Sequence, residues 1–311
     1  MAPYGVTEDA AASLVATLAK PSPLVKTLAA PPTLPLELVA TMSKTVAAHK
    51  NASGTSAAAA SYRCAGTLVS KKHVITAAHC FMGKQGCSSP LTLKNVIEKL
   101  EIYYGGTCIE PGHPDCEDGH ENMEKVGVVR AQYQKFFTSG NCSKGHDIAF
   151  LELESEINET HICLPHLHKD PGFRSMNKFV SFGWGSDPIK NINVHATLQK
   201  VDHAVIFEKS YCKKNYHGMP FDVICTQEYE NKDMCQGDSG GGFVTHDASY
   251  PERYFLQGLV SFGTDCTNLL GGERAKFQVF TDITYHSASI DKFIFGSSVH
   301  VAAKTLVDKG W

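Results

Sequence analysis

The chain has 311 residues, of which 42% are hydrophobic and 20% are charged, and its formal net charge is −3. This composition is typical of a globular protein with one large core or two modest ones, and it offers no excess of positive charge for nucleic acid or anionic membranes. No segment approaches the roughly 18 consecutive apolar residues of a membrane span. Eleven cysteines, none of them in a CxxC pair, favour disulfides in an oxidising compartment over a metal site.

The beginning of the chain differs in composition from the rest. Residues 1–60 are rich in Ala, Pro, Thr and Ser, and the prolines interrupt any regular helix. We expect a disordered leader or propeptide here, with a wrongly assigned start of translation or a short helix near 34–48 as alternatives. Residues 1–20 lack a basic segment and carry Glu8 and Asp9, so no signal peptide is evident.

From residue 61 the pattern changes to short β-type runs separated by turns that contain Gly or Pro. The first series comprises residues 67–69, 73–76, 100–103, 126–133 and 148–153. A second series follows a connection rich in Pro and His and comprises residues 179–182, 198–207, 223–225, 242–245, 254–262 and 277–283. These patterns predict an all-β protein of two antiparallel six-stranded barrels, over about 61–165 and 172–283. Short helices are expected at 210–215 and 285–295, followed by a tail over 296–311.

Three short motifs carry the groups that peptide-bond hydrolysis needs. Thr-Ala-Ala-His-Cys contains His79, Gly-His-Asp-Ile-Ala contains Asp147, and Cys-Gln-Gly-Asp-Ser-Gly-Gly contains Ser239. A serine hydroxyl becomes a nucleophile when a histidine removes its proton, and a carboxylate holds that histidine in the correct tautomer. Each motif alone has a structural interpretation, such as a turn aspartate or a chance serine among glycines. The ordered set of three favours a catalytic triad.

With His, Asp and Ser in this order, the chain resembles the chymotrypsin/trypsin-like serine endopeptidases over about residues 64–294. The resemblance implies the two-barrel fold with a short intermediate helix and a C-terminal helix. It also implies hydrolysis through an acyl-enzyme intermediate, protein or peptide substrates, protein protease inhibitors as further partners, and neither an organic cofactor nor a catalytic metal. The 68 residues between His79 and Asp147 exceed the family's usual spacing, which places an insertion within 81–122.

The resemblance assigns roles to individual residues. Ser239 is the expected nucleophile, His79 the general acid and base, and Asp147 the orienting carboxylate. The backbone N–H groups of Gly237 and Ser239 are the expected oxyanion hole, because glycines permit the backbone angles that direct two donors at one point.

Substrate choice depends on a second set of residues. Asp233 stands where trypsin-like members place the carboxylate that pairs with a substrate Arg or Lys, which predicts cleavage after these residues. Ser261, Phe262 and Gly263 match the segment that binds the substrate backbone as an added strand. Gln278 replaces a glycine that lines the pocket in trypsin-like enzymes. Its side chain would fill the pocket or bond Asp233, and this opposes the prediction.

The cysteines extend the resemblance, which implies disulfides from Cys64 to Cys80, from Cys212 to Cys225 and from Cys235 to Cys266. Cys163 resembles the cysteine that ties the catalytic domain of many members to a propeptide, although no cysteine precedes Cys64. Its partner is therefore missing unless it lies in the insertion. The remaining cysteines allow three pairings of two bridges, and they are Cys87, Cys108, Cys116 and Cys142.

Family members are zymogens, in which cleavage frees an amine that pairs with an aspartate at the position of Asp238. No convincing cleavage sequence precedes Cys64. Together with Gln278, this supports an alternative function as an inactive homologue that binds proteins through the same cleft.

The cysteines favour a secreted protein, and three Asn-x-Ser/Thr sequons, at Asn51, Asn141 and Asn158, are compatible with a glycoprotein. Residues 112–121 contain several carboxylates and imidazoles, but we interpret them as a solvated acidic loop rather than a calcium site.

Overall fold

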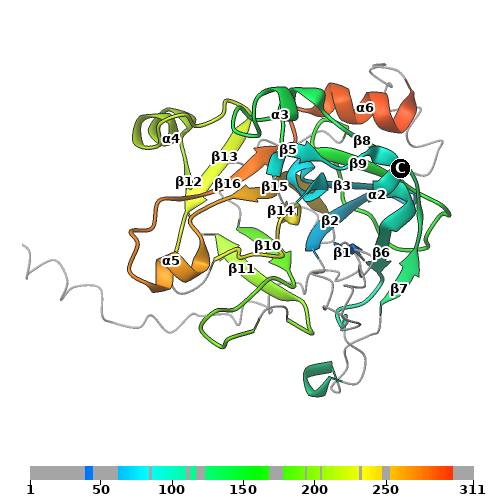
Figure 1. Ribbon diagram of the computed structural model, residues 1–311, viewed down its shortest axis with the longest axis horizontal. Coiled ribbons are helices and arrows are strands. Elements are labelled where there is room, and N and C mark those ends of the chain that lie inside the picture. The colour runs from blue at the N-terminus through cyan, green and yellow to red at the C-terminus, as the bar shows by residue number, and fades with distance from the viewer. Residues whose placement is uncertain are drawn as a thin grey trace, which may run out of the picture. The chain divides into compact units, whose positions relative to one another are not determined.

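The computed structural model describes residues 39–44, 62–83, 86–109, 113–116, 123–167, 178–192, 195–203, 205–230, 233–246 and 253–296. These residues form two antiparallel seven-stranded sheets, one from each half of the chain, and a two-stranded hairpin. Figure 1 shows the strands of the two sheets as neighbouring groups.

The first sheet has the order β7-β6-β1-β2-β3-β9-β8. Its strands are β1 (Val39–Lys44), β2 (Tyr62–Ser70), β3 (His73–Thr76), β6 (Leu100–Tyr104), β7 (Glu124–Val126), β8 (Val128–Tyr133) and β9 (Ala149–Leu153). The strands at the two ends of this order, β7 and β8, are separated in the chain only by Gly127. One bent segment therefore pairs with β6 on one side and β9 on the other, and it closes the sheet into a barrel of six chain segments.

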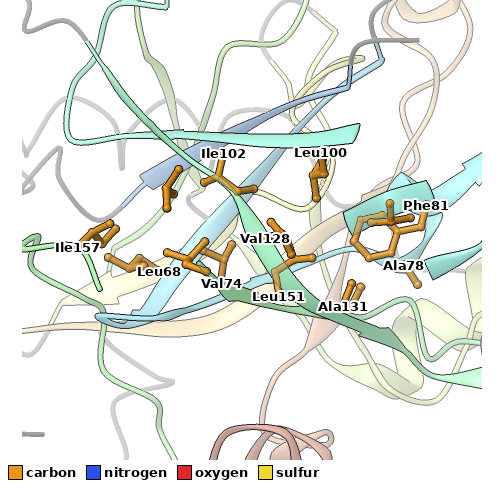
Figure 2. Packing of buried hydrophobic residues seen from close by; sticks show 14 of the residues in the cluster. Leu68, Val74, Ala78, Phe81, Leu100, Ile102, Val128, Ala131, Leu151 and Ile157 are labelled. Atoms are coloured by element: carbon orange, nitrogen blue, oxygen red, sulfur yellow. The ribbon is translucent and has the colours of Figure 1, made fainter. Parts of the chain in front are cut away.

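Alternating side chains of these strands fill the interior of the first barrel. Leu68, Val74, Ile102, Val128 and Leu151 come from five different strands and meet in one buried cluster (Figure 2). This is the expected result of the period of two residues along a strand, which sends every second side chain to the same face.

The second sheet has the order β11-β10-β14-β15-β16-β13-β12. Its strands are β10 (Phe179–Gly183), β11 (Gln199–His203), β12 (Ile206–Phe207), β13 (Val223–Gln227), β14 (Gly242–His246), β15 (Tyr254–Phe262) and β16 (Phe277–Asp282). Its outermost strands, β11 and β12, are again neighbours in the chain, so two consecutive strands close this barrel in the same way as the first. In its core the Phe243 ring stacks on Phe179 and Phe280, with centroids 5.0 and 4.3 Å apart. The predicted fold class is confirmed.

Helices lie outside the barrels. The expected helices near 210–215 and 285–295 are present as α4 (Lys209–Asn215) and α6 (Ser287–Phe295). Although α6 follows the second barrel, it packs on the first, where Phe293 stacks on Phe150 with centroids 5.3 Å apart (Figure 1). The other helical segments are η2 (Ala78–Phe81), α2 (Leu93–Lys99), η3 (Pro114–Cys116), α3 (Lys135–Ser139) and α5 (Cys266–Leu270). No described helix is long and apolar enough to cross a membrane.

Two regions differ from the sequence interpretation. The strand β1 lies before residue 61, where composition placed the start of the domain, and it occupies the range where a short helix was the alternative. Its six residues, Val-Ala-Thr-Met-Ser-Lys, alternate too weakly to indicate a strand, and pairing with β2 and β6 on its two sides determines its conformation. The predicted insertion contains the hairpin of β4 (Met82–Gly83) and β5 (Gly86–Pro90) and the helix α2. The rest of the expected leader and the tail after Gly296 lie outside the described residues.

Candidate active site

His79 and Asp147 meet because two adjacent strands deliver them to the same end of the first barrel. His79 lies in η2, directly after β3, and Asp147 precedes β9, which pairs with β3. His79 Nδ1 lies 2.7 Å from Asp147 Oδ2, and the backbone N–H of His79 donates to Oδ1 at 2.8 Å. Both carboxylate oxygens therefore orient the same histidine, and Nε2 remains available on the opposite side of the ring.

The second barrel holds this carboxylate in place. Ser261, in β15, donates its hydroxyl to Asp147 Oδ2 at 2.5 Å, and Thr281, in β16, donates to the backbone carbonyl of Asp147 at 2.9 Å. The sequence interpretation assigned Ser261 to substrate binding and missed its contact with Asp147. No local pattern predicts a hydrogen bond between residues 114 positions apart.

Electrostatics at this pair favour the charged forms of both groups. Burial alone would lower the pKa of His79, but the charge and hydrogen bond of Asp147 outweigh it and raise that pKa above its usual value. Burial alone would raise the pKa of Asp147, which is only 6% exposed, but His79 and the hydrogen bond from Ser261 hold it below its usual value. The pair suits a base that becomes cationic during a reaction.

Ser239 lies in a turn that packs against the segment preceding His79. Its carbonyl accepts a hydrogen bond from the N–H of Ala65 at 2.8 Å, and Gly240 donates to the carbonyl of Val260 at 2.8 Å. A Cβ on Gly240 would lie 2.6 Å from the carbonyl oxygen of Ala65 and 2.8 Å from the N of Ala77, so only glycine fits here. The Ser239 hydroxyl bonds to no described residue, and hydrogen bonds of this kind commonly tighten when substrate binds.

Two backbone donors are available beside this serine. Gly237 has φ of +107°, and no acceptor among the described residues takes the N–H groups of Gly237 and Ser239. These are the two donors that the resemblance assigns to the oxyanion hole.

The structure contains five disulfides. The three implied by the resemblance are present, joining Cys64 to Cys80, Cys212 to Cys225 and Cys235 to Cys266. The four insertion-related cysteines adopt one of the three open pairings, Cys87 to Cys142 and Cys108 to Cys116. Cys163 is a free thiol, and burial raises its pKa.

Asp233 and the His79–Asp147 pair line two different cavities. A cleft of about 540 Å³ is lined by His79, Asp147, Ser261 and Phe262, whereas Asp233 lines a separate cavity of about 180 Å³. The carboxylate of Asp233 accepts N–H groups from Tyr229 and Met234 at 2.9 and 2.8 Å. Burial nevertheless raises its pKa to about 7, which is the behaviour of a carboxylate without a neighbouring cation.

Gln278 occupies space beside the expected substrate-binding segment. It is 2% exposed, and its Nε2 donates to the carbonyl of Phe262 at 3.3 Å. A Cβ on Gly263 would lie 2.6 Å from Gln278 Oε1 and 2.9 Å from an oxygen of the buried Glu228. Gln278 does not bond Asp233, which was one of the two expectations for this residue. Its side chain instead fills space beside Gly263. The sequence interpretation did not include Glu228 among the site residues.

Asp238 is a buried carboxylate beside the serine turn. It accepts N–H groups from Gly185 and Cys235 at 2.8 and 2.9 Å. Burial raises its pKa to about 6 despite these bonds, and no described Lys, Arg or His side chain forms an ion pair with it. Within the described part of the chain, this carboxylate has no compensating positive charge.

Comparison with known proteins agrees with this fold. A family model for trypsin matches residues 42–285. The trypsin-like protease try-5 of Caenorhabditis elegans is 33% identical over 257 residues, which cover 74% of this chain and 77% of that protein. The chain therefore belongs to the trypsin family of serine proteases.

More distant relatives have longer chains than this protein. Phenoloxidase-activating factor 1 of Holotrichia diomphalia is 24% identical over 66% of this chain and 56% of its own length. Coagulation factor XII of Cavia porcellus is 26% identical over 74% of this chain and 36% of its own length. This chain thus spans about half or less of these two proteins.

Proposed function

We propose that the chain is a serine endopeptidase in which Ser239 attacks the scissile carbonyl carbon. His79 takes the hydroxyl proton as the C–O bond forms, and Asp147 stabilises the resulting imidazolium. The carbonyl oxygen becomes an oxyanion that accepts from the N–H groups of Gly237 and Ser239, each typically worth about 3 kcal/mol in the transition state. His79 then protonates the leaving amine, and water hydrolyses the acyl-enzyme by the same steps.

The observation that carries this proposal is the 2.7 Å pair of His79 and Asp147, with Ser261 of the second barrel holding the carboxylate. A domain that only binds proteins has no chemical need for a histidine oriented through both oxygens of a buried aspartate. The alternative, an inactive homologue, is supported by the uncompensated Asp238 and by Gln278.

Covalent labelling distinguishes these two functions. A fluorophosphonate probe should label the correctly processed protein, and Ser239→Ala should abolish the labelling. Absence of labelling in protein that is folded and processed, or labelling that persists in Ser239→Ala, would reject the proposed enzyme.

We further propose cleavage after Arg or Lys, with Asp233 as the supporting residue. Gln278 opposes this proposal, because its side chain packs beside Gly263 in the segment expected to bind substrate. A library of peptide substrates that varies the residue before the scissile bond tests this directly. Equal cleavage after Arg, Lys and neutral residues would reject basic specificity.

The protein is also proposed to be a secreted zymogen that carries glycans at its sequons. Five disulfides support an oxidising compartment, and the buried Asp238 supports activation by a new amine that enters beside it. N-terminal sequencing of the mature protein tests the activation step, because it identifies the residue that carries this amine.

A further inference from the structure

One of the sequons lies at the rim of the cleft of about 540 Å³ that contains the candidate active site. The four residues that follow Asn141, residues 142–145, line this cleft together with His79. Asn141 itself is exposed, and the other members of its sequon, Cys142 and Ser143, belong to the wall of the cleft. A group attached to the side-chain amide of Asn141 therefore begins at the entrance to the cleft.

The wall of the cleft holds this attachment point in place. The backbone N–H of Asn141 donates to the carbonyl of Thr138 at 3.1 Å, and that of Cys142 donates to the carbonyl of Phe137 at 2.9 Å. A disulfide also joins Cys142 to Cys87. Asn141 has φ of +53°, a left-handed conformation that asparagine tolerates better than most residues. These bonds fix the backbone that would carry a glycan.

A second sequon gives a comparison within the same barrel. Asn158 is also exposed, but it follows β9, whereas the cleft lies at the beginning of that strand. The neighbouring Ile157 donates its N–H to the carbonyl of Lys71 at 2.9 Å, in the turn between β2 and β3. Because β3 runs from this turn towards His79, and the five residues of β9 span about 15 Å, Asn158 lies at the far end of the barrel. The third sequon, Asn51, lies outside the described residues.

We propose that an N-glycan on Asn141 shields the cleft from folded proteins and admits short peptides. Such a glycan is bulky and hydrated. Two globular proteins in contact bury about 800 Å² on each partner, which corresponds to a disc of about 16 Å radius. A disc of this size centred on His79 includes Asn141, because this residue adjoins the wall of the cleft. A short peptide occupies only the cleft. The shielding of hydrolysis rests on the proposed secreted protease, whereas the position of the sequon does not.

Occupancy is measured on the full chain secreted from a eukaryotic host. Peptide mapping by mass spectrometry should find a glycan on Asn141. Asn141→Asp removes the sequon and keeps a residue that tolerates a left-handed backbone. Asn158→Asp is the matched control, because it removes a glycan from the far end of the barrel. Peptide N-glycosidase, applied to a chain without the Asn51 and Asn158 sequons, leaves the same aspartate at position 141 and replaces the variant if that variant does not fold.

Shielding is first measured without catalysis, in Ser239→Ala. Lys144 is exposed and lines the cleft, and its Cβ lies 3.0 Å from the position of a Cβ on Gly140, next to Asn141. One amine-reactive ester is attached to a small reporter and to a branched polyethylene glycol, and the ratio of their rates cancels the reactivity of the lysine. The glycan should slow the large reagent at Lys144 about three- to tenfold relative to the small one, because it hinders encounter. Lys190, whose side chain is 66% exposed, should show no such effect.

Shielding of catalysis is measured on the processed protein with an intact Ser239. A fluorophosphonate is attached to a small reporter and to a globular carrier protein. Asn141→Asp should speed labelling by the carrier-linked probe about three- to tenfold and leave the small probe unchanged, and Asn158→Asp should change neither. An unmodified Asn141, or equal ratios at Lys144 with and without its glycan, would overturn the proposal. Shielding at Lys144 without labelling of Ser239 by either probe would uphold the glycan shield and reject the protease.

Discussion

The buried carboxylate of Asp238 leads to a quantitative expectation for stability. Its pKa is about 6 in the folded chain, compared with about 3.9 for an unfolded aspartate. A carboxyl group whose pKa is raised by folding stabilises the native state below the unfolded pKa, and this contribution is lost as the pH rises through the folded pKa. A shift of about 2 units corresponds to about 3 kcal/mol, lost between about pH 4 and pH 7.

The substitution Asp238→Asn removes the titration and keeps the size of the side chain. In the unprocessed chain with Ser239→Ala, we expect the free energy of unfolding of the variant minus that of the parent to rise by about 3 kcal/mol from pH 4 to pH 8. Any constant cost of replacing the acceptor for the Gly185 and Cys235 N–H groups cancels in this comparison. Urea unfolding with intact disulfides at five pH values measures this difference in unfolding free energy. The exposed Asp202→Asn serves as the control.

A pH-independent difference between variant and parent would refute this reasoning, since it would mean that a positive charge already neutralises Asp238 before processing. The processed protein provides the complementary measurement. Once a new amine pairs with Asp238, removing the carboxylate leaves that amine buried and unpaired, so Asp238→Asn should then destabilise the protein near pH 7.

Four further expectations concern activity and stability. Asp147→Asn should lower kcat by about 10⁴, the effect known for this exchange in the family's reference triad, and an unchanged kcat would exclude the assigned role. Because the pKa of His79 is raised, the acidic limb of the kcat/KM profile should lie above pH 6.5. Gln278→Gly should raise kcat/KM for Arg substrates relative to Ala substrates, and an unchanged ratio would count against its obstructing role. Replacing both Cys87 and Cys142 by Ser should cost about 2–4 kcal/mol in urea unfolding.

Sequence reasoning predicted the fold where the signal is local. The barrels follow from runs of three to ten residues whose alternation one can count. His79, Asp147 and Ser239 each lie in a short motif, which is why the sequence alone nominates them for the site. The short helix before β13 and the C-terminal helix have similarly local patterns. These features need no knowledge of which strands become neighbours.

Sequence reasoning failed where contacts between distant parts of the chain determine the local structure. The strand β1 depends on partners on both of its sides, and the hydrogen bond from Ser261 to Asp147 crosses between barrels. The pairing of Cys87 with Cys142 depends on where the insertion folds, because spacing alone permits three arrangements.

These long-range contacts share one location, the junction where the second barrel supports the segment that carries Asp147. Ser261 and Thr281 hold Asp147 itself, and Asp222 holds the N–H of the preceding residue, His146. The histidine comes from the first barrel, so the geometry of the His79–Asp147 pair depends on how the two barrels sit against each other. Any change in the position of His146 therefore alters the orientation of His79 through Asp147, without direct contact with the base.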